Sequence, residues 1–149
     1  MQMNLLYGTE TSTAELLCED LEKEVGGEVN TQVFDIADVA PESLSSDEFY
    51  VLVTSTFGSG DLPANAQVFY DNLSRAKPDL SAVKFAIFGL GDRSFGDTYN
   101  GGSKQLMEKM LELGAQMVGE RGMFDASGAD MPEDVAVPWL RDVMSRAAA

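Results

Sequence analysis

Four hydroxyl side chains follow the first apolar run of the chain and stand directly before a predicted helix. They belong to the segment Gly8-Thr9-Glu10-Thr11-Ser12-Thr13. Such hydroxyls and the free backbone N–H groups of a helix N-terminus can together bind an anion. The segment has no Lys or Arg and no GK[ST] sequence, which argues against a nucleoside triphosphate with magnesium. A single terminal phosphate fits better, although one or two of these residues would also suffice for a plain helix N-cap.

Two later loops combine glycines with an aromatic residue. Residues 54–63 contain Phe57, and residues 89–95 end with Phe95. Glycine lets the backbone approach a ligand closely, and two rings on neighbouring strands could stack on both faces of a planar group. Either ring alone would more simply pack onto the core. The second loop is a near miss to GxGxxG, in the wrong strand–helix unit for a dinucleotide site. Together the three loops predict a ligand with one phosphate and a planar, neutral head, a description that flavin mononucleotide (FMN) fits.

Short apolar runs and amphipathic segments alternate about five times, which predicts a parallel sheet covered on both faces by helices. The predicted strands are 3–7, 29–33, 49–53, 83–88 and a weaker one in two pieces, 116–118 and 122–124. The predicted helices contain 14–25, 66–73, 106–111 and 139–144, and Pro138 is expected in the first turn of the last one. Ligands of such sheets bind at the carboxyl ends of the strands, where all three loops fall.

Composition excludes several classes of protein. The 149 residues predict one domain, and 25 acidic against 10 basic residues give a formal charge of −15. That charge argues against binding to nucleic acid or to a membrane surface. The absence of histidine excludes Ser-His-Asp triads and nearly all zinc sites. The single cysteine, Cys18, fits core packing, and the chain predicts a cytoplasmic protein without a signal peptide or a transmembrane span.

These loops resemble those of the flavodoxin family over nearly the whole chain. The similar segments are 8–13, 55–58, 89–92 and 125–128. Residues 60–63 and 77–83 most resemble the short flavodoxins of the MioC and YqcA type, and the chain is also similar to the FMN domains of diflavin reductases. The resemblance implies a flavodoxin-like α/β fold: a doubly wound five-stranded parallel sheet of order 2-1-3-4-5 with helices on both faces. It also implies one FMN-binding domain over residues 1–149.

The resemblance further implies which residues contact FMN. The loop that wraps the phosphate comprises Thr9, Glu10, Thr11, Ser12 and Thr13. The flavin ring lies between Thr56, Phe57 and Gly58 on one face and Phe95 on the other. Its pyrimidine edge contacts Leu90, Gly91 and Asp92, and Asp125 lies beside the ring. Two of these positions depart from the family, because Phe57 replaces a Trp or Tyr and Phe95 replaces a Tyr. Arg93 adds a positive charge near an acidic rim.

The leading hypothesis is therefore a monomeric one-electron carrier without catalytic or metal-binding residues. The resemblance implies an electron donor of the flavodoxin/ferredoxin-NADP reductase type and an acceptor enzyme such as a biotin synthase-like protein or a P450, each docking through a basic surface. An FMN-dependent quinone or NAD(P)H oxidoreductase is the alternative, but it would need an NAD(P)H-binding surface that the chain does not show. A flavin-free receiver domain would need acidic residues where Tyr7-Gly8-Thr9 and Thr54-Ser55-Thr56 stand.

Overall fold

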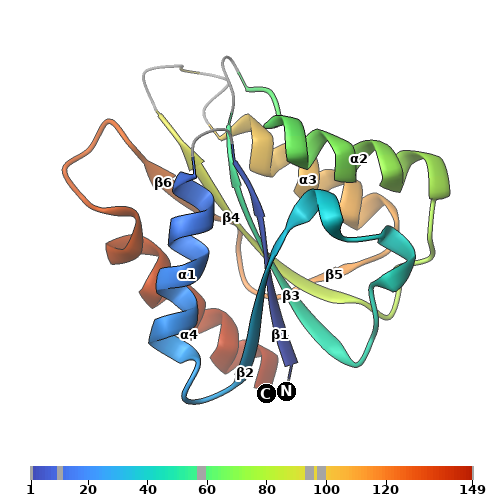
Figure 1. The fold of residues 1–149 in the computed structure, drawn as a ribbon, viewed down its shortest axis with the longest axis horizontal. Helices are drawn as coiled ribbons and strands as arrows, with labels where there is room; N and C mark the ends of the chain where they lie inside the picture. The colour runs from blue at the N-terminus through green and yellow to red at the C-terminus, as the bar shows by residue number, and fades with distance from the viewer. Residues whose placement is uncertain (1, 10–11, 57–59, 93–95, 97–99, 149) are drawn as a thin grey trace.

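The computed structural model describes residues 2–9, 12–56, 60–92, 96 and 100–148. Within them the chain forms a parallel sheet with helices on both faces (Figure 1). The strands are β1 (Gln2–Gly8), β2 (Asn30–Asp35), β3 (Glu48–Ser55), β4 (Lys84–Gly91), β5 (Gln116–Met117) and β6 (Gly122–Asp125). The α-helices are α1 (Thr13–Val25), α2 (Ala64–Ala76), α3 (Gly101–Glu112) and α4 (Pro132–Ala148). Two short 3-10 helices, η1 (Ile36–Asp38) and η2 (Pro41–Ser43), connect β2 to β3.

The strand order is β2-β1-β3-β4-β5, which confirms the predicted order 2-1-3-4-5. The fifth position is divided between two short strands, as the two apolar pieces of the sequence indicate. β5 pairs with the start of β4 at Lys84 and Phe85, whereas β6 pairs with its end, from Phe88 to Gly91. Residues 118–121 separate the two strands, so β6 brings its own loop to the carboxyl end of β4.

Each face of the sheet has its own hydrophobic core. On one face α1 and α4 pack over the sheet, and on the other α2 and α3 do so together with η1 and η2 (Figure 1). The side chains of β3 from Phe49 to Thr54 are all buried, as expected for a strand covered on both faces. β2 alternates between exposed and half-buried residues because it is the edge strand.

The prediction for Pro138 is wrong. Helix α4 begins at Pro132, so Pro138 lies inside the helix and not in its first turn. Proline has no N–H to donate to the carbonyl of Asp134, and this lost hydrogen bond is the reason to expect it at a helix start. Ala136 and Leu140, which flank Pro138, are fully buried, so packing against the sheet holds the helix together on both sides of it.

In the part of the chain that the structure describes, no helix combines the length and the apolar character that a membrane crossing requires.

Candidate functional site

The loops that the sequence singles out leave the sheet along one edge. Gly8 at the end of β1 lies opposite Thr54 of β3, and Thr54 lies opposite Gly89 of β4. At the end of β6, Asp125 lies opposite Gly91. The carboxyl ends of four strands are therefore level with one another, which places the described starts of the segments after β1, β3, β4 and β6 together.

The phosphate loop ends in an unusual helix start. Ser12, the N-cap residue of α1, has left-handed backbone angles (φ 70°), and its hydroxyl makes no capping hydrogen bond. A plain N-cap serine would be extended and would bond to the N–H groups of the first turn, so that interpretation does not describe Ser12. A left-handed residue directly before a helix turns successive N–H groups towards one point, a geometry that suits an anion. Glu10 and Thr11 lie outside the described residues.

Asn65, which the sequence motifs do not indicate, holds the start of this loop. The backbone N–H of Thr9 donates to Oδ1 of Asn65 on α2 (2.9 Å). The Asn65 amide nitrogen in turn donates to the carbonyl of Tyr7 (3.2 Å) and to Oδ1 of Asp35 (3.1 Å). Asn65 thus ties the ends of β1 and β2 to the start of α2. An Asn near a helix start usually indicates a local cap, so no sequence signal identified these distant partners.

The loop after β3 is fixed against the first turn of α3. The N–H of Thr56 donates to the carbonyl of Leu90 (3.0 Å), and the Thr56 hydroxyl accepts from the N–H of Gly102 (3.2 Å). A Cβ atom on Gly102 would stand 2.7 Å from the carbonyl oxygen of Ser55. Only glycine allows this approach. Phe57 and Gly58, the proposed ring-facing residues of this loop, lie outside the described residues.

The same helix also holds the far end of that loop. A Cβ on Gly101 would stand 2.7 Å from the carbonyl oxygen of Gly60, and this oxygen accepts from the side-chain amide of Gln105 (2.7 Å). The start of α3 and the loop after β3 therefore form one packed unit, although they lie some forty residues apart in the sequence.

The loop after β4 ends at a buried asparagine. Asn100 is fully buried and left-handed (φ 56°), and its backbone carbonyl accepts from the Arg121 guanidinium (3.0 Å), which also donates to Ser103 Oγ (3.0 Å). A Cβ on Gly91 would stand 2.9 Å from the backbone nitrogen of Asn100, so the two ends of this loop nearly touch. Neither Asn100 nor Arg121 was predicted from the sequence to belong to the site. Arg93 and Phe95 lie outside the described residues.

The remaining predicted positions lie at the same edge. The Leu90 side chain is buried in the core beneath α1 and α4, so only its backbone can serve a ligand. The carbonyl of Gly91 accepts from the N–H of Ala126 (2.7 Å). The carboxylate of Asp125 accepts from the N–H (2.9 Å) and the hydroxyl (2.7 Å) of Ser127 and thereby stabilises its own turn. Asp125 thus has a structural role in this turn that the sequence does not indicate.

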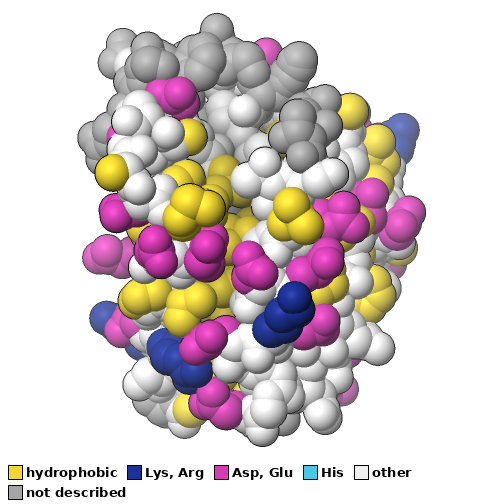
Figure 2. Space-filling view, turned by 60° about the vertical axis from the view of Figure 1, so that its left-hand side comes forward, with side chains coloured by type: hydrophobic (Ala, Val, Ile, Leu, Met, Phe, Trp, Pro, Cys, Tyr) yellow, Lys and Arg dark blue, Asp and Glu magenta, His cyan; other side chains and the backbone are white. Residues whose placement is uncertain are grey.

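The electrostatic surroundings are acidic. Burial, together with the negative charges of Glu15 and Asp35, raises the pKa of the Tyr7 phenol at the end of β1, which keeps it neutral. Figure 2 shows many acidic and few basic side chains on the side of α1 and α4. On that side Arg141 pairs with Glu24 and Glu28 (3.3 and 3.0 Å). Among the described residues no cluster of acidic, Cys or His side chains could hold a metal ion.

The parallel sheet, the level strand ends and the glycine-dependent loops define a nucleotide-binding α/β protein of the flavodoxin type. The family model for flavodoxin matches residues 5–139, and the chain belongs to this family. Its overall fold matches a flavodoxin from Pseudomonas aeruginosa that carries one cysteine-to-serine substitution, at a TM-score of 0.86 and 29% identity over the whole of both chains.

Two sequence relatives are similar to different extents of the chain. Protein MioC of Escherichia coli O157:H7 is 39% identical over 99 residues, which cover 66% of this chain and 67% of MioC. NADPH-dependent diflavin oxidoreductase 1 of Emericella nidulans is 37% identical over 144 residues, which cover 91% of this chain but only 21% of that protein. The chain therefore spans about a fifth of the length of the diflavin relative. The family confirms two predictions: FMN is its cofactor, and flavodoxins are electron carriers.

Proposed function

We propose that residues 1–149 form one FMN-binding domain that carries electrons between an NAD(P)H-dependent reductase and an acceptor enzyme in the cytoplasm. The observation that carries this proposal is the edge of the sheet at which four strand ends lie level, together with the helix start without a side-chain cap and the two glycine-dependent loops found there. FMN supplies the one-electron chemistry when it is bound, and the protein supplies its position and electrostatic surroundings.

The described residues fit FMN. Neutral donors at the start of α1, among them the Ser12 hydroxyl that makes no cap, suit a phosphate that carries its own negative charge. We assign the phosphate to residues 9–13, and the flavin ring to residues 56–58, 90–92 and 95, with Asp125 beside it. Asn65 and Asn100 position these loops without being assigned to FMN themselves.

The partners follow from charge. A formal charge of −15 suits docking to basic surfaces, as on a flavodoxin/ferredoxin-NADP reductase-type donor. A biotin synthase-like enzyme and a P450 are both acceptors that this chemistry would serve. The carrier would act as a monomer, without nucleic acid or membrane.

The cofactor assignment is tested by Thr11→Asp, with Ser46→Asp as a charge-matched control. The new carboxylate at position 11 would repel the phosphate dianion in a partly dry site, so FMN affinity should fall by about a hundredfold or more. Ser46 is exposed in the turn before β3, and its substitution should leave the FMN Kd within about twofold. Fluorescence titration of the flavin-free chain with FMN measures both.

Equal affinity in the two variants would show that residues 9–13 do not hold the phosphate. NAD(P)H alone should not bleach the FMN-loaded protein, whereas NAD(P)H with a reductase should. Rapid bleaching without a reductase would favour the FMN-dependent oxidoreductase instead.

The docking proposal predicts a salt-dependent association with the reductase. The second-order rate of reduction should fall roughly tenfold between about 0.01 M and about 0.5 M salt, because ions screen charges of opposite sign on the two proteins. Reoxidation by an uncharged quinone is the control, and its rate should not change. A reductase reaction equally insensitive to salt would mean that the acidic surface does not serve docking.

A further inference from the structure

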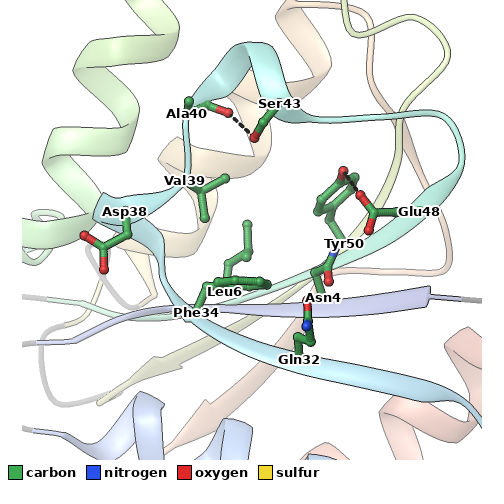
Figure 3. A pocket seen from close by; sticks show the side chains of 10 residues that line it. All are labelled: Asn4, Leu6, Gln32, Phe34, Asp38, Val39, Ala40, Ser43, Glu48 and Tyr50. Carbon is green, nitrogen blue, oxygen red and sulfur yellow. Dashed lines mark hydrogen bonds between the residues drawn. The ribbon is translucent and has the colours of Figure 1, made fainter.

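A pocket lies away from the candidate FMN site, on the face of the sheet that α2 and α3 cover (Figure 3). Its volume is about 330 Å³, at the lower end of the range for small-ligand sites. The connection between β2 and β3 contains only the 3-10 helices η1 and η2, so this connection places no α-helix over the edge strand β2. Residues 38–40 and Ser43 form the roof of this pocket, which we call the β2 pocket.

The floor of the β2 pocket carries three polar side chains in one row. Asn4 of β1 lies opposite Gln32 of β2 and opposite Tyr50 of β3, so all three point to the same face of the sheet. Figure 3 shows them on one side of the pocket, next to Glu48. In the core of an ordinary sheet this row would be apolar, because the helices on that face would cover it.

The Asn4 side chain can make more hydrogen bonds than the described residues provide. The residue is 4% exposed, and its Oδ1 accepts from the side-chain amide of Gln2 (3.1 Å). Among the described residues its amide nitrogen has no acceptor, and the side chain lines the pocket. This nitrogen is not among the fully buried side-chain atoms and the residue lines the pocket, so it can donate to water or to a guest that offers a carbonyl or another acceptor in place of the water.

The other walls define the rest of the guest. Leu6, Val39 and the ring of Phe34 form an apolar wall, and Phe34 remains 37% exposed. The charged residues that line the pocket are Asp38 and Glu48, and no Lys or Arg lines it. Negative charge at the rim favours a cation and disfavours an anion, and the face of an aromatic ring adds to this preference.

We propose that the β2 pocket binds a small organic cation that also carries an amide or another hydrogen-bond acceptor. The acceptor would bond to the Asn4 amide nitrogen, the apolar body would pack on Leu6 and Phe34, and the ammonium group would lie near Asp38 and Glu48. Its separate location makes this site independent of the FMN assignment, because none of its lining residues belongs to the proposed FMN loops.

Three matched probes test the proposal on the FMN-loaded protein. Phenylalaninamide has a cation, a ring and an amide; N-acetylphenylalaninamide lacks the cation; N-acetylphenylalanine carries a negative charge instead. With about a dozen non-hydrogen atoms the first should bind in the millimolar range. The second should bind roughly tenfold more weakly, and the third should not bind measurably at about 10 mM. Chemical shifts of backbone amides at residues 4, 32 and 38–40 report the location.

Two substitutions identify the groups responsible. Asn4→Leu removes the donor, and Phe34→Ala removes the partly exposed ring. Each should weaken phenylalaninamide binding about tenfold or more. Leu111→Ala, at an exposed site on α3 outside the pocket, is the control and should leave binding unchanged. FMN affinity verifies folding in each variant. The proposal fails if the three probes bind alike, if shifts lie elsewhere, if no probe binds, or if both pocket variants bind as the unchanged protein does.

Discussion

The two candidate sites of this protein are built from different materials. At the carboxyl edge of the sheet, backbone segments pack so closely that a Cβ atom would clash at Gly91, Gly101 and Gly102. In the β2 pocket the polar groups are side chains, Asn4 and Gln32 among them, on regular strands.

This difference explains which site the sequence reveals. A backbone-built site needs glycines and hydroxyls in short contiguous loops, and such loops form readable motifs. A side-chain-built site collects single residues from distant segments, here from position 4 to position 50, and each of them looks ordinary in its own segment. Substitutions should therefore affect the two sites in different ways.

The largest effect is expected from adding one methyl group at the carboxyl edge. A Cβ on Gly89 would stand 2.7 Å from Cβ of Ser103 and closer still to Asn100 Oδ1, so Gly89→Ala forces buried groups apart. We expect a loss of about 3 kcal/mol in the free energy of unfolding. Gly27→Ala is the matched control, because its Cβ would meet nothing within 4 Å, and its effect should stay within about 0.5 kcal/mol. Urea denaturation of both variants measures this, and equal stabilities would contradict the packing described for α3.

A pair of asparagines gives the next largest effect and separates the two sites directly. Asn65→Leu removes the acceptor for the Thr9 N–H and the donor to the carbonyl of Tyr7, and it should weaken FMN binding about tenfold. Asn4→Leu makes the same chemical change in the β2 pocket and should leave the FMN Kd within about twofold. If both variants lost FMN equally, the two sites would not be independent.

Most of the fold could be predicted from the sequence, because apolar periodicity reports which faces are buried. The continuous run from Phe49 to Val53 indicated a strand covered on both faces, and the two weak pieces of the last strand correspond to β5 and β6. Pro138 was misplaced because helix propensity is local, whereas the burial of Ala136 and Leu140 depends on tertiary packing.

The candidate site was only partly predictable for a related reason. Hydroxyls and glycines within one loop are visible in the sequence, and the starts of those loops do lie together. Asn65, Asn100 and Arg121 act across long separations, from the start of α2 to the end of β1 or from residue 121 to residue 100. Nothing in a single sequence links such residues, because each partner is brought near only by the crossovers of the sheet.

The smallest effect concerns pH and the Tyr50 phenol in the floor of the β2 pocket. Its oxygen accepts from the N–H of Ser45 (2.8 Å), and its O–H donates to Glu48 (3.2 Å). Burial is the main cause that raises the pKa of Tyr50, the hydrogen bond from Ser45 opposes it, and Glu48 adds to it. The neutral phenol is thus favoured in the folded state, so stability is unaffected below the unfolded pKa near 10 and falls as the pH rises towards the folded pKa.

Tyr50→Phe removes this titration together with the hydrogen bond to Ser45. Near pH 8 the variant should be less stable by about 1 kcal/mol, the usual net worth of such a bond. Above pH 10 the difference should shrink by at most about 1.4 kcal/mol per pH unit, because only the unsubstituted chain still carries the raised phenol pKa. Burial also raises the pKa of the Cys18 thiol, but both chains share that residue and its contribution cancels in the difference. Urea denaturation midpoints of both chains from pH 8 to pH 11 provide the test. A constant difference in stability would mean that Tyr50 ionises as freely in the folded chain as in the unfolded chain. FMN affinity at pH 8 is the control and should be the same in both chains, because Tyr50 lies outside the carboxyl edge of the sheet.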